Sequence, residues 1–185
     1  EAALAVPDPD GDAIELLVAT QSLHDDRRQI AACLDLPPDR VRLELRGVGG
    51  AFGGREEPTV QIPAAILARK CGRPVRIVSS REDSFLGHPH RHPARIWMRH
   101  HADDDGRLVN LEARIVLDGG AYTSTSRAVI VNAVTQAQGP YFVPNARIDG
   151  WAVRTNNPPN GAMRGFGVPQ VCFADEPQMD PLAAA

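Results

Sequence analysis

The chain has 185 residues, a length that suits one large domain or two small ones. Hydrophobic residues make up 43% of it and charged residues 23%, which excludes a disordered tail, a collagen-like repeat and a coiled coil. The net charge of -3 and the aromatic content of 5% supply neither the positive field nor the stacking surfaces that nucleic acids require, so no nucleic-acid partner is expected.

The three cysteines, Cys33, Cys71 and Cys172, are widely spaced and form no CxxC pair. They indicate neither a disulfide framework nor a zinc site, and we expect reduced, mostly buried thiols in a cytoplasmic protein. No apolar run approaches the roughly 18 residues of a membrane helix, so neither a membrane partner nor a signal peptide is expected. Because the chain starts on Glu1 and stops on three alanines, we expect a piece of a longer protein.

The first half of the chain alternates apolar strand patterns with amphipathic helix patterns. The elements expected there are a strand over 14–20, a helix over 22–35, a strand over 41–45, a helix over 59–70, a strand over 75–79 and a helical turn over 81–86. Gly72 lies where a glycine commonly terminates a helix.

The second half begins with two longer strands, expected over 95–101 and 108–117 and joined by an Asp-Gly hairpin turn at 103–106. Residues 118–120 are expected to break the second strand. A helix over 126–137, a strand over 146–155 and a last helix from about 168 towards 179 follow. His100 and His101 beside the hairpin are expected to be solvated. This irregular order predicts an α+β fold with mixed sheets and packed helices.

A glycine-rich run over 47–54 lies between a predicted strand and a predicted helix. Glycines permit positive φ and close approach of a ligand to the backbone, and the following helix start offers N–H groups to an anion. The run is neither a dinucleotide-binding fingerprint, because Phe52 occupies the last glycine position, nor a P-loop, because no Gly-Lys-Ser/Thr follows. The alternative is a flexible turn.

A second segment of the same kind covers residues 160–170, with Arg164 and a glycine-framed Phe166 before a helix. Taken alone, Arg164 is as well explained by a surface ion pair as by an anion. Two such phenylalanines predict a pocket with aromatic walls and backbone donors. We expect both loops to lie near one cavity.

Residues 49–56 (GGAFGGRE) and 163–170 (MRGFGVPQ) resemble the molybdopterin-binding signatures of the xanthine dehydrogenase and aldehyde oxidase family. The resemblance is to the bacterial molybdenum subunit of xanthine dehydrogenase rather than to the carbon monoxide dehydrogenase branch. Shorter matches occur in the family's order at 19–21 (ATQ), 72–75 (GRPV), 91–93 (RHP), 118–122 (DGGAY), 139–141 (GPY) and 155–157 (TNN). The resemblance implies that 1–185 is part of the first molybdopterin-binding region of that family, with a candidate sub-boundary near residues 90–94.

The resemblance assigns roles to individual residues. Gln21 matches a glutamine that hydrogen-bonds an oxo ligand of molybdenum, and Glu56 matches a glutamate of the substrate pocket; we place both among the catalytic residues. Phe52, Gly53 and Arg164 match residues that contact the cofactor, so with Gln21 they form the expected cofactor-binding set. Phe166 matches a phenylalanine that packs on a flat substrate ring. In this family the pterin dithiolene holds the metal, so no protein metal ligand is expected.

The family reaction implied by the resemblance hydroxylates a purine, another N-heteroaromatic ring or an aldehyde with oxygen from water. Its cofactor is molybdopterin with molybdenum, and iron-sulfur clusters and FAD reside on other domains or subunits. The remaining molybdopterin-binding domain, those subunits and the small-molecule substrate are the expected partners. The family's general base lies near the end of its complete chain and has no match here, so the isolated chain is expected to be inactive.

Three alternatives remain open. The histidines at positions 88, 90 and 92 would share one face of an extended segment and could bind zinc or nickel adventitiously. Purine-specific members carry an arginine where Asn132 stands, so purine specificity is in doubt. The chain could also be a non-enzymatic α+β ligand-binding or assembly module that retains the glycine-rich loops, which an alanine at Gln21 or Glu56 in close relatives would favour.

Overall fold

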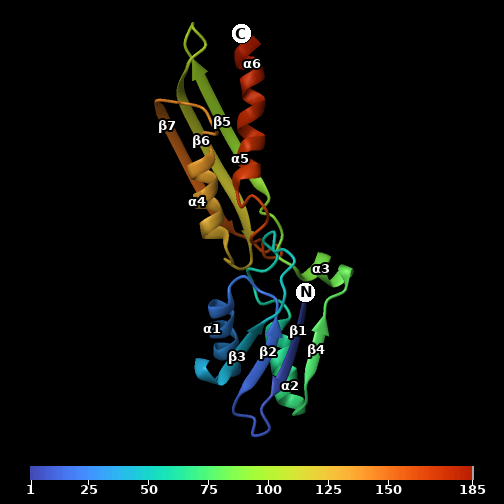
Figure 1. Cartoon of the computed structure of the whole chain (residues 1–185). Coiled ribbons are helices and arrows are strands. Elements are labelled where there is room, and N and C mark those ends of the chain that lie inside the picture. The colour runs from blue at the N-terminus through green and yellow to red at the C-terminus, as the bar shows by residue number, and fades with distance from the viewer. Residues whose placement is uncertain (185) are drawn as a thin grey trace. The chain divides into compact units, whose positions relative to one another are not determined.

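The structure is a computed structural model that describes residues 1–184. They form two compact units, Glu1–His88 and a second that begins at Pro89 (Figure 1). Each unit combines a β-sheet with helices, and the two sheets together hold parallel and antiparallel pairs, which confirms the expected α+β class. The extent of a partial domain over 1–185, with a sub-boundary near 90–94, stays a prediction. Among the described residues, no helix is both long and apolar enough to cross a membrane.

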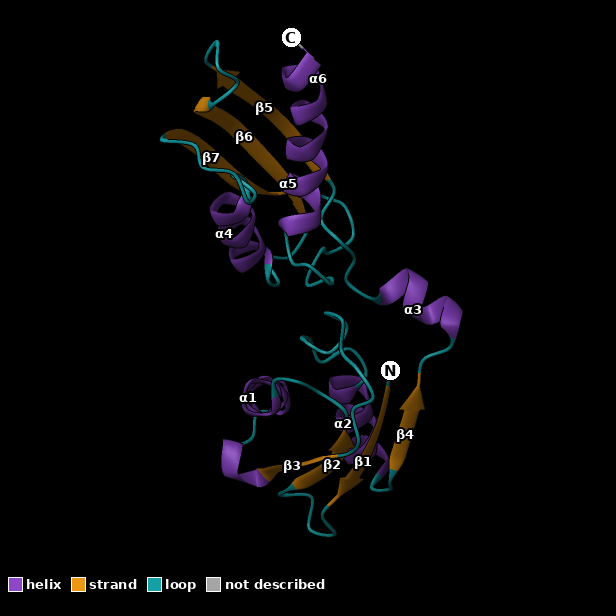
Figure 2. Ribbon diagram, turned by 45° about the horizontal axis from the view of Figure 1, so that its top comes forward, coloured by secondary structure: helices purple, strands orange, loops and turns teal. Residues whose placement is uncertain are grey.

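The first unit has a four-stranded sheet in the order β3-β2-β1-β4, in which only β2 and β3 run parallel. Its elements are β1 (Ala2–Pro7), β2 (Ile14–Val18), α1 (Leu23–Leu34), a 3-10 turn (Pro38–Arg40), β3 (Val41–Leu45), α2 (Gln61–Cys71), β4 (Val75–Val78) and α3 (Arg81–Gly87). Helices α1 and α2 pack on the sheet and on each other, so one face of the sheet is covered (Figure 2). Gly72 ends α2 at a φ of 60°, as expected.

The strand β1 is central to this sheet, although no strand was expected before residue 14. It pairs with both β2 and β4. Alanine has a low strand propensity, which explains why the segment carries no strand signal. Ala3 and Ala5 are buried and face α2, and their small side chains let the helix approach the sheet closely.

The second unit has a three-stranded sheet in the order β5-β6-β7, antiparallel between β5 and β6 and parallel between β6 and β7. Its elements are β5 (Ala94–Ala102), β6 (Leu108–Gly120), α4 (Ser126–Gln136), β7 (Asn145–Arg154), α5 (Val168–Asp175), a 3-10 turn (Glu176–Gln178) and α6 (Met179–Ala184). Helices α4 and α5 contact each other and the sheet. They cover the face of the sheet that carries the buried side chains of β6. The expected Asp-Gly hairpin is present, with Gly106 at a φ of 78°.

The expected break at 118–120 is wrong, because β6 continues through Gly120. Its pairing with β7 shifts register between Asp118 and Gly120, as in a β-bulge. The Asp118 carboxylate accepts hydrogen bonds from the Thr155 hydroxyl at 2.6 Å and from the Gly120 N–H at 2.9 Å. These bonds, with a further one from Asn157, hold the pKa of Asp118 below its usual range. The carboxylate thus fastens the bulge instead of ending the strand.

Three other expectations need correction. The helix expected from about 168 towards 179 is interrupted after Asp175, because Pro177 lies in a 3-10 turn and has no N–H to continue the α-helical ladder, and α6 then begins at Met179. His100 is buried rather than solvated, with Nε2 at 3.1 Å from Asp175 Oδ1, because it lies on the covered face of β5. Cys33 and Cys71 are exposed, whereas buried thiols were expected.

Leu16 lies in the centre of the first unit's core and is fully buried. We expect Leu16→Ala to lower the free energy of unfolding by about 2–5 kcal/mol, since it removes buried methyl groups and leaves a cavity. The matched control Leu86→Ala, at a side chain that is 76% exposed, should change it by no more than about 0.5 kcal/mol. Urea unfolding followed by far-UV circular dichroism measures both, and equal losses would contradict the assignment of Leu16 to the core.

Asp118 is expected to make the stability of the second unit acid-sensitive. Its folded-state pKa is depressed, so the carboxylate's contribution is present above the ordinary aspartate pKa and is lost as pH falls through the depressed value. Between about pH 6 and about pH 3, Asp118→Asn should therefore lose less stability than the wild type in urea unfolding. Fluorescence of Trp97 and Trp151, both in this unit, reports the transition. Asp104→Asn, at an exposed turn residue, is the control, and identical acid profiles in both variants would refute the role of Asp118.

Candidate functional site

Gln21 and Glu56 are neighbours in the first unit, although 35 residues separate them. The Gln21 side-chain amide donates a hydrogen bond of 2.5 Å to Glu56 Oε1. The segments that carry them are joined at Arg55, whose carbonyl oxygen accepts from the Gln21 N–H at 3.2 Å and from the Thr20 hydroxyl at 3.3 Å. The loop after β2 and the loop before α2 therefore hold these two predicted catalytic side chains side by side.

The glycine-rich loop between β3 and α2 has a defined conformation at Phe52. Phe52 lies in the left-handed region with a φ of 54°, and Gly53 follows at 91°. For a residue with a side chain this conformation costs roughly 1–2 kcal/mol, so surrounding contacts must hold it. Gly54 N–H donates to the Ala51 carbonyl at 2.8 Å and closes the turn. A Cβ on Gly50 would lie 2.7 Å from the Phe52 ring, so the ring folds directly over that glycine. The loop is thus a shaped turn.

Three charged or titratable side chains lie next to the end of this loop, namely Glu1, Glu57 and His88. Burial raises the pKa of Glu57, which His88 opposes and the neighbouring Glu56 reinforces. His88 Nε2 lies 3.1 Å from the Gly54 carbonyl oxygen. The Arg55 guanidinium forms a 2.8 Å ion pair with Glu1 and also donates to the Ala19 carbonyl at 3.3 Å. Arg55 thus contacts Glu1 and Ala19, and the adjacent Glu56 accepts the hydrogen bond from Gln21.

The loop over 164–167 in the second unit repeats the conformation of the first loop. Phe166 has a φ of 48°, and it lies between Gly165 at 89° and Gly167 at 100°. A Cβ on Gly165 would lie 2.5 Å from the Pro169 ring, so a side chain has no room there. The Phe166 N–H donates to the Met163 carbonyl at 2.7 Å. Both predicted phenylalanines therefore adopt the same uncommon backbone conformation.

Two side chains from other segments hold this second loop. Arg91 donates to the Arg164 carbonyl at 2.6 Å, and the Asn132 amide donates to the Phe166 carbonyl at 2.6 Å. Neither contact was expected from the sequence. Arg91 belongs to the RHP match, and Asn132 was noted only as a departure from an arginine. Their spacing in sequence, 73 and 34 residues from the loop, carries no local signal.

The histidines at positions 88, 90 and 92 do not form a metal site. His88 contacts Gly54 in the first unit, whereas His92 is buried in the second, with Nε2 at 2.7 Å from Ser126 Oγ. Burial lowers the pKa of His92, and the charge of Asp118 only partly opposes this shift. Within residues 1–184, no group of His, Cys, Asp and Glu side chains could hold a metal ion. His92 therefore has a structural role, as it joins the start of β5 to α4.

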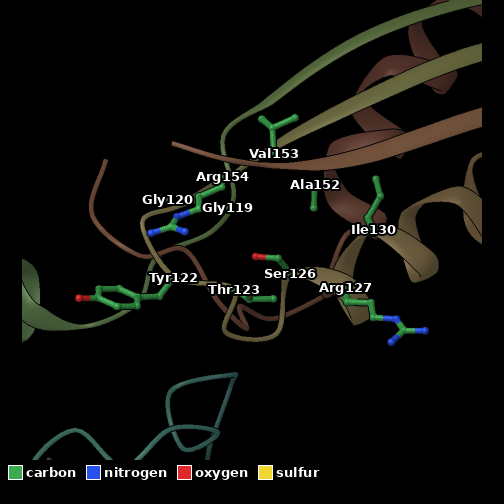
Figure 3. A pocket seen from close by; sticks show the side chains of 10 residues that line it. All are labelled: Gly119, Gly120, Tyr122, Thr123, Ser126, Arg127, Ile130, Ala152, Val153 and Arg154. Carbon is green, nitrogen blue, oxygen red and sulfur yellow. The ribbon is translucent and has the colours of Figure 1, made fainter. Parts of the chain in front are cut away.

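A cavity of about 260 Å³ lies between the start of α4 and the end of β7. It is lined by Gly119, Gly120, Tyr122, Thr123, Ser126, Arg127, Ile130, Ala152, Val153 and Arg154. In Figure 3, the guanidinium groups of Arg127 and Arg154 lie at opposite ends and point away from each other. None of the predicted site residues lines it. This cavity is distinct from the two glycine-framed loops.

The predicted site residues fall into two groups. Gln21, Phe52, Gly53 and Glu56 belong to the first unit, and Arg164 and Phe166 belong to the second. Within each group, the structure brings the residues onto one loop or onto adjoining segments. That the two loops meet around one cofactor, and the role of each residue towards it, stay predictions.

Comparison with known proteins identifies the family. The family model described as the molybdopterin cofactor-binding domain matches residues 1–185. The chain is 40% identical over 183 residues to a probable xanthine dehydrogenase subunit of Bacillus subtilis (strain 168), covering 99% of the chain and 24% of that protein. It is 42% identical over 172 residues to the nicotinate dehydrogenase large molybdopterin subunit of Eubacterium barkeri, covering 93% of the chain and 40% of that protein.

The fold is shared with a solved structure, the aldehyde oxidoreductase of Desulfovibrio gigas. The TM-score is 0.91 at 30% identity, and the match covers 99% of this chain and 20% of that one. The chain thus spans well under half the length of these similar proteins. The chain belongs to the molybdopterin cofactor-binding domain family, and its resemblance to the xanthine dehydrogenase and aldehyde oxidase family is confirmed.

Proposed function

We propose that this chain supplies one part of a molybdenum cofactor cage and of a substrate pocket in a longer hydroxylase. The observation that carries the proposal is the 2.5 Å hydrogen bond between Gln21 and Glu56. Glu56 lies on the segment that follows the left-handed Phe52–Gly53 turn. The reaction is hydroxylation of an N-heteroaromatic ring or an aldehyde with oxygen from water. No observation on residues 1–184 favours the non-enzymatic alternative.

The residues present fit a cofactor that brings its own metal ligands and is rich in acceptor atoms. Arg91 Nη1 is buried and has no hydrogen-bond partner among the described residues, so a donor remains beside the Arg164 loop for a pterin or phosphate oxygen. A Cβ on Gly49 would meet no atom within 4 Å, so the backbone there is open to a ligand. Gln21, Phe52, Gly53 and Arg164 would hold the group. When bound, the group supplies oxidation of a substrate carbon with water-derived oxygen.

Gln21 and Glu56 have complementary roles in this proposal. The Gln21 amide is a donor that turns from Glu56 to an oxygen of the bound group and keeps that oxygen oriented. Glu56 Oε1 then becomes free to accept a hydrogen bond from a ring N–H or hydroxyl of the substrate. The short bond between the two side chains keeps both in place until cofactor and substrate bind. Phe166, half-buried against the second unit's core, presents a ring for a flat substrate to pack on.

The substrate class proposed is a flat N-heteroaromatic compound or an aldehyde. The similar proteins are named for xanthine and for nicotinate. Asn132 stands where purine-specific members carry an arginine, and its amide is engaged with the Phe166 carbonyl. Position 132 therefore provides no cation to bind a purine substrate. We propose the other N-heteroaromatics as the preferred substrates.

The proposed partners are the remaining molybdopterin-binding domain and domains or subunits that carry iron-sulfur clusters and FAD. They would remove the electrons that substrate oxidation releases. We propose a cytoplasmic location, in which the exposed Cys33 and Cys71 would stay reduced.

The full-length protein that contains this chain tests the proposal. Purified from a host that makes the cofactor, it should contain close to one molybdenum and one pterin per chain. With xanthine, nicotinate and an aromatic aldehyde as substrates in ¹⁸O-labelled water, the product should carry the label. A folded protein without molybdenum, or with a product oxygen derived from dioxygen, would overturn the proposal.

Gln21→Ala in the full-length protein is expected to lower kcat about a hundredfold or more, because it removes a donor aimed at developing charge. Gln21 is exposed in the loop between β2 and α1, so folding should be unaffected. Gln29→Ala, at an exposed glutamine of α1 in the same unit, is the matched control and should retain wild-type kinetics. Steady-state rates are compared with molybdenum content. An unchanged kcat with full molybdenum would reduce Gln21 to a strand-end residue, and a loss of molybdenum would assign it to binding instead.

A further inference from the structure

Asn132 lies on α4 and contacts the backbone of the 164–167 loop. Its Nδ2 donates a 2.6 Å hydrogen bond to the carbonyl oxygen of Phe166. That carbonyl belongs to the residue whose φ of 48° is uncommon for a side chain of this size. We propose that Asn132 is a positioning residue, which holds the Phe166 peptide in this conformation and so fixes the ring against which a flat substrate packs. The substrate part of this inference rests on the proposed function.

The 164–167 loop packs directly against α4. The contact beside Asn132 is so close that a side chain on Gly167 would clash with the helix backbone. A Cβ on Gly167 would lie 2.6 Å from the Val129 carbonyl oxygen and 3.1 Å from the Ala133 nitrogen. Val129, Asn132 and Ala133 are spaced as i, i+3 and i+4, which places them on one face of the helix. The backbone of α4 therefore packs closely against Gly167, and the Asn132 amide on the same face donates a hydrogen bond to the loop.

The direction of the hydrogen bond explains why an amide is needed. The carbonyl of Phe166 points at Nδ2 only while the residue stays in the left-handed region, because rotation to an ordinary φ reorients the peptide. The Asn132 bond thus favours the left-handed conformation of Phe166 over an ordinary one. A carboxylate at the same place would offer only acceptors to a carbonyl oxygen, and an aliphatic side chain would offer nothing.

The ring of Phe166 follows its backbone. The side chain is half-buried and packs against the core cluster that contains Val129 and Val171. A change of φ at Phe166 would move the ring out of this contact and away from where the loop presents it. The proposal therefore predicts a loss in substrate binding, expressed in KM, with a smaller effect on kcat and none on the molybdenum content.

Asn132→Asp in the full-length protein tests the proposal, with Asn132→Leu as a second variant in case a charge at this half-buried position prevents folding. Hydrogen exchange of the 164–168 amides should become about tenfold faster in both variants, because a restraint on the loop is lost. KM for nicotinate or xanthine, whichever the wild type oxidises, should rise about tenfold while kcat stays within about threefold. The matched controls Gln136→Glu and Gln136→Leu make the same changes at an exposed position of α4 and should change neither.

Two results would overturn the inference. Unchanged exchange at 164–168 in both folded variants would show that Asn132 does not hold the loop. Faster exchange with an unchanged KM would show that the loop's conformation does not serve the substrate. The exchange measurement needs no enzymatic activity. If the wild type contains no molybdenum and oxidises none of the compounds, the proposed function fails while the exchange data still decide the role of Asn132 towards the loop.

Discussion

The left-handed backbone at Phe52 and at Phe166 is the constraint on which both loops depend. A side chain in this region costs roughly 1–2 kcal/mol, so each phenylalanine persists only where its neighbours offset that cost. The flanking glycines make the turns sterically feasible, since Gly53 and Gly167 have φ of 91° and 100°. Hydrogen bonds and packing then select this state from the others that glycine allows. The elements of each unit supply the contacts that hold these two turns.

The supports differ between the units because the loops leave different elements. In the first unit, the loop returns to the end of β2, where the Arg55 carbonyl accepts from both Thr20 and Gln21. A backbone acceptor fixes the place of Gln21 without using its amide, which is left to meet Glu56. In the second unit, the loop is held by side chains that donate to its carbonyls. Backbone contacts at Arg55 thus set the place of Gln21 beside the first loop, whereas side chains hold the backbone of the second loop.

Local patterns predicted most of the fold, because they are set by neighbours in sequence. The apolar alternation of β2, the Asp-Gly hairpin and the glycine after α2 all appear where expected. The errors concern tertiary contacts. β1 is a strand because it lies between two others, and His100 is buried because β5 faces a helix. The motifs located both candidate loops, but neither the backbone state of the phenylalanines nor the Asn132 contact can be read from them. Both depend on packing against distant segments.

Side-chain length at position 132 determines what α4 can hold. The short amide of Asn132 ends within 2.6 Å of the Phe166 carbonyl, so it acts on the loop backbone. An arginine at the same place would carry its charge beyond three methylene groups, past that carbonyl. Such a side chain would give up the compact amide contact with the loop. Arg127, five residues earlier on α4, lines the separate cavity beside β7 and does not replace it. One residue therefore links two features of this chain: an amide that donates to the Phe166 carbonyl and the absence of a cationic side chain at position 132.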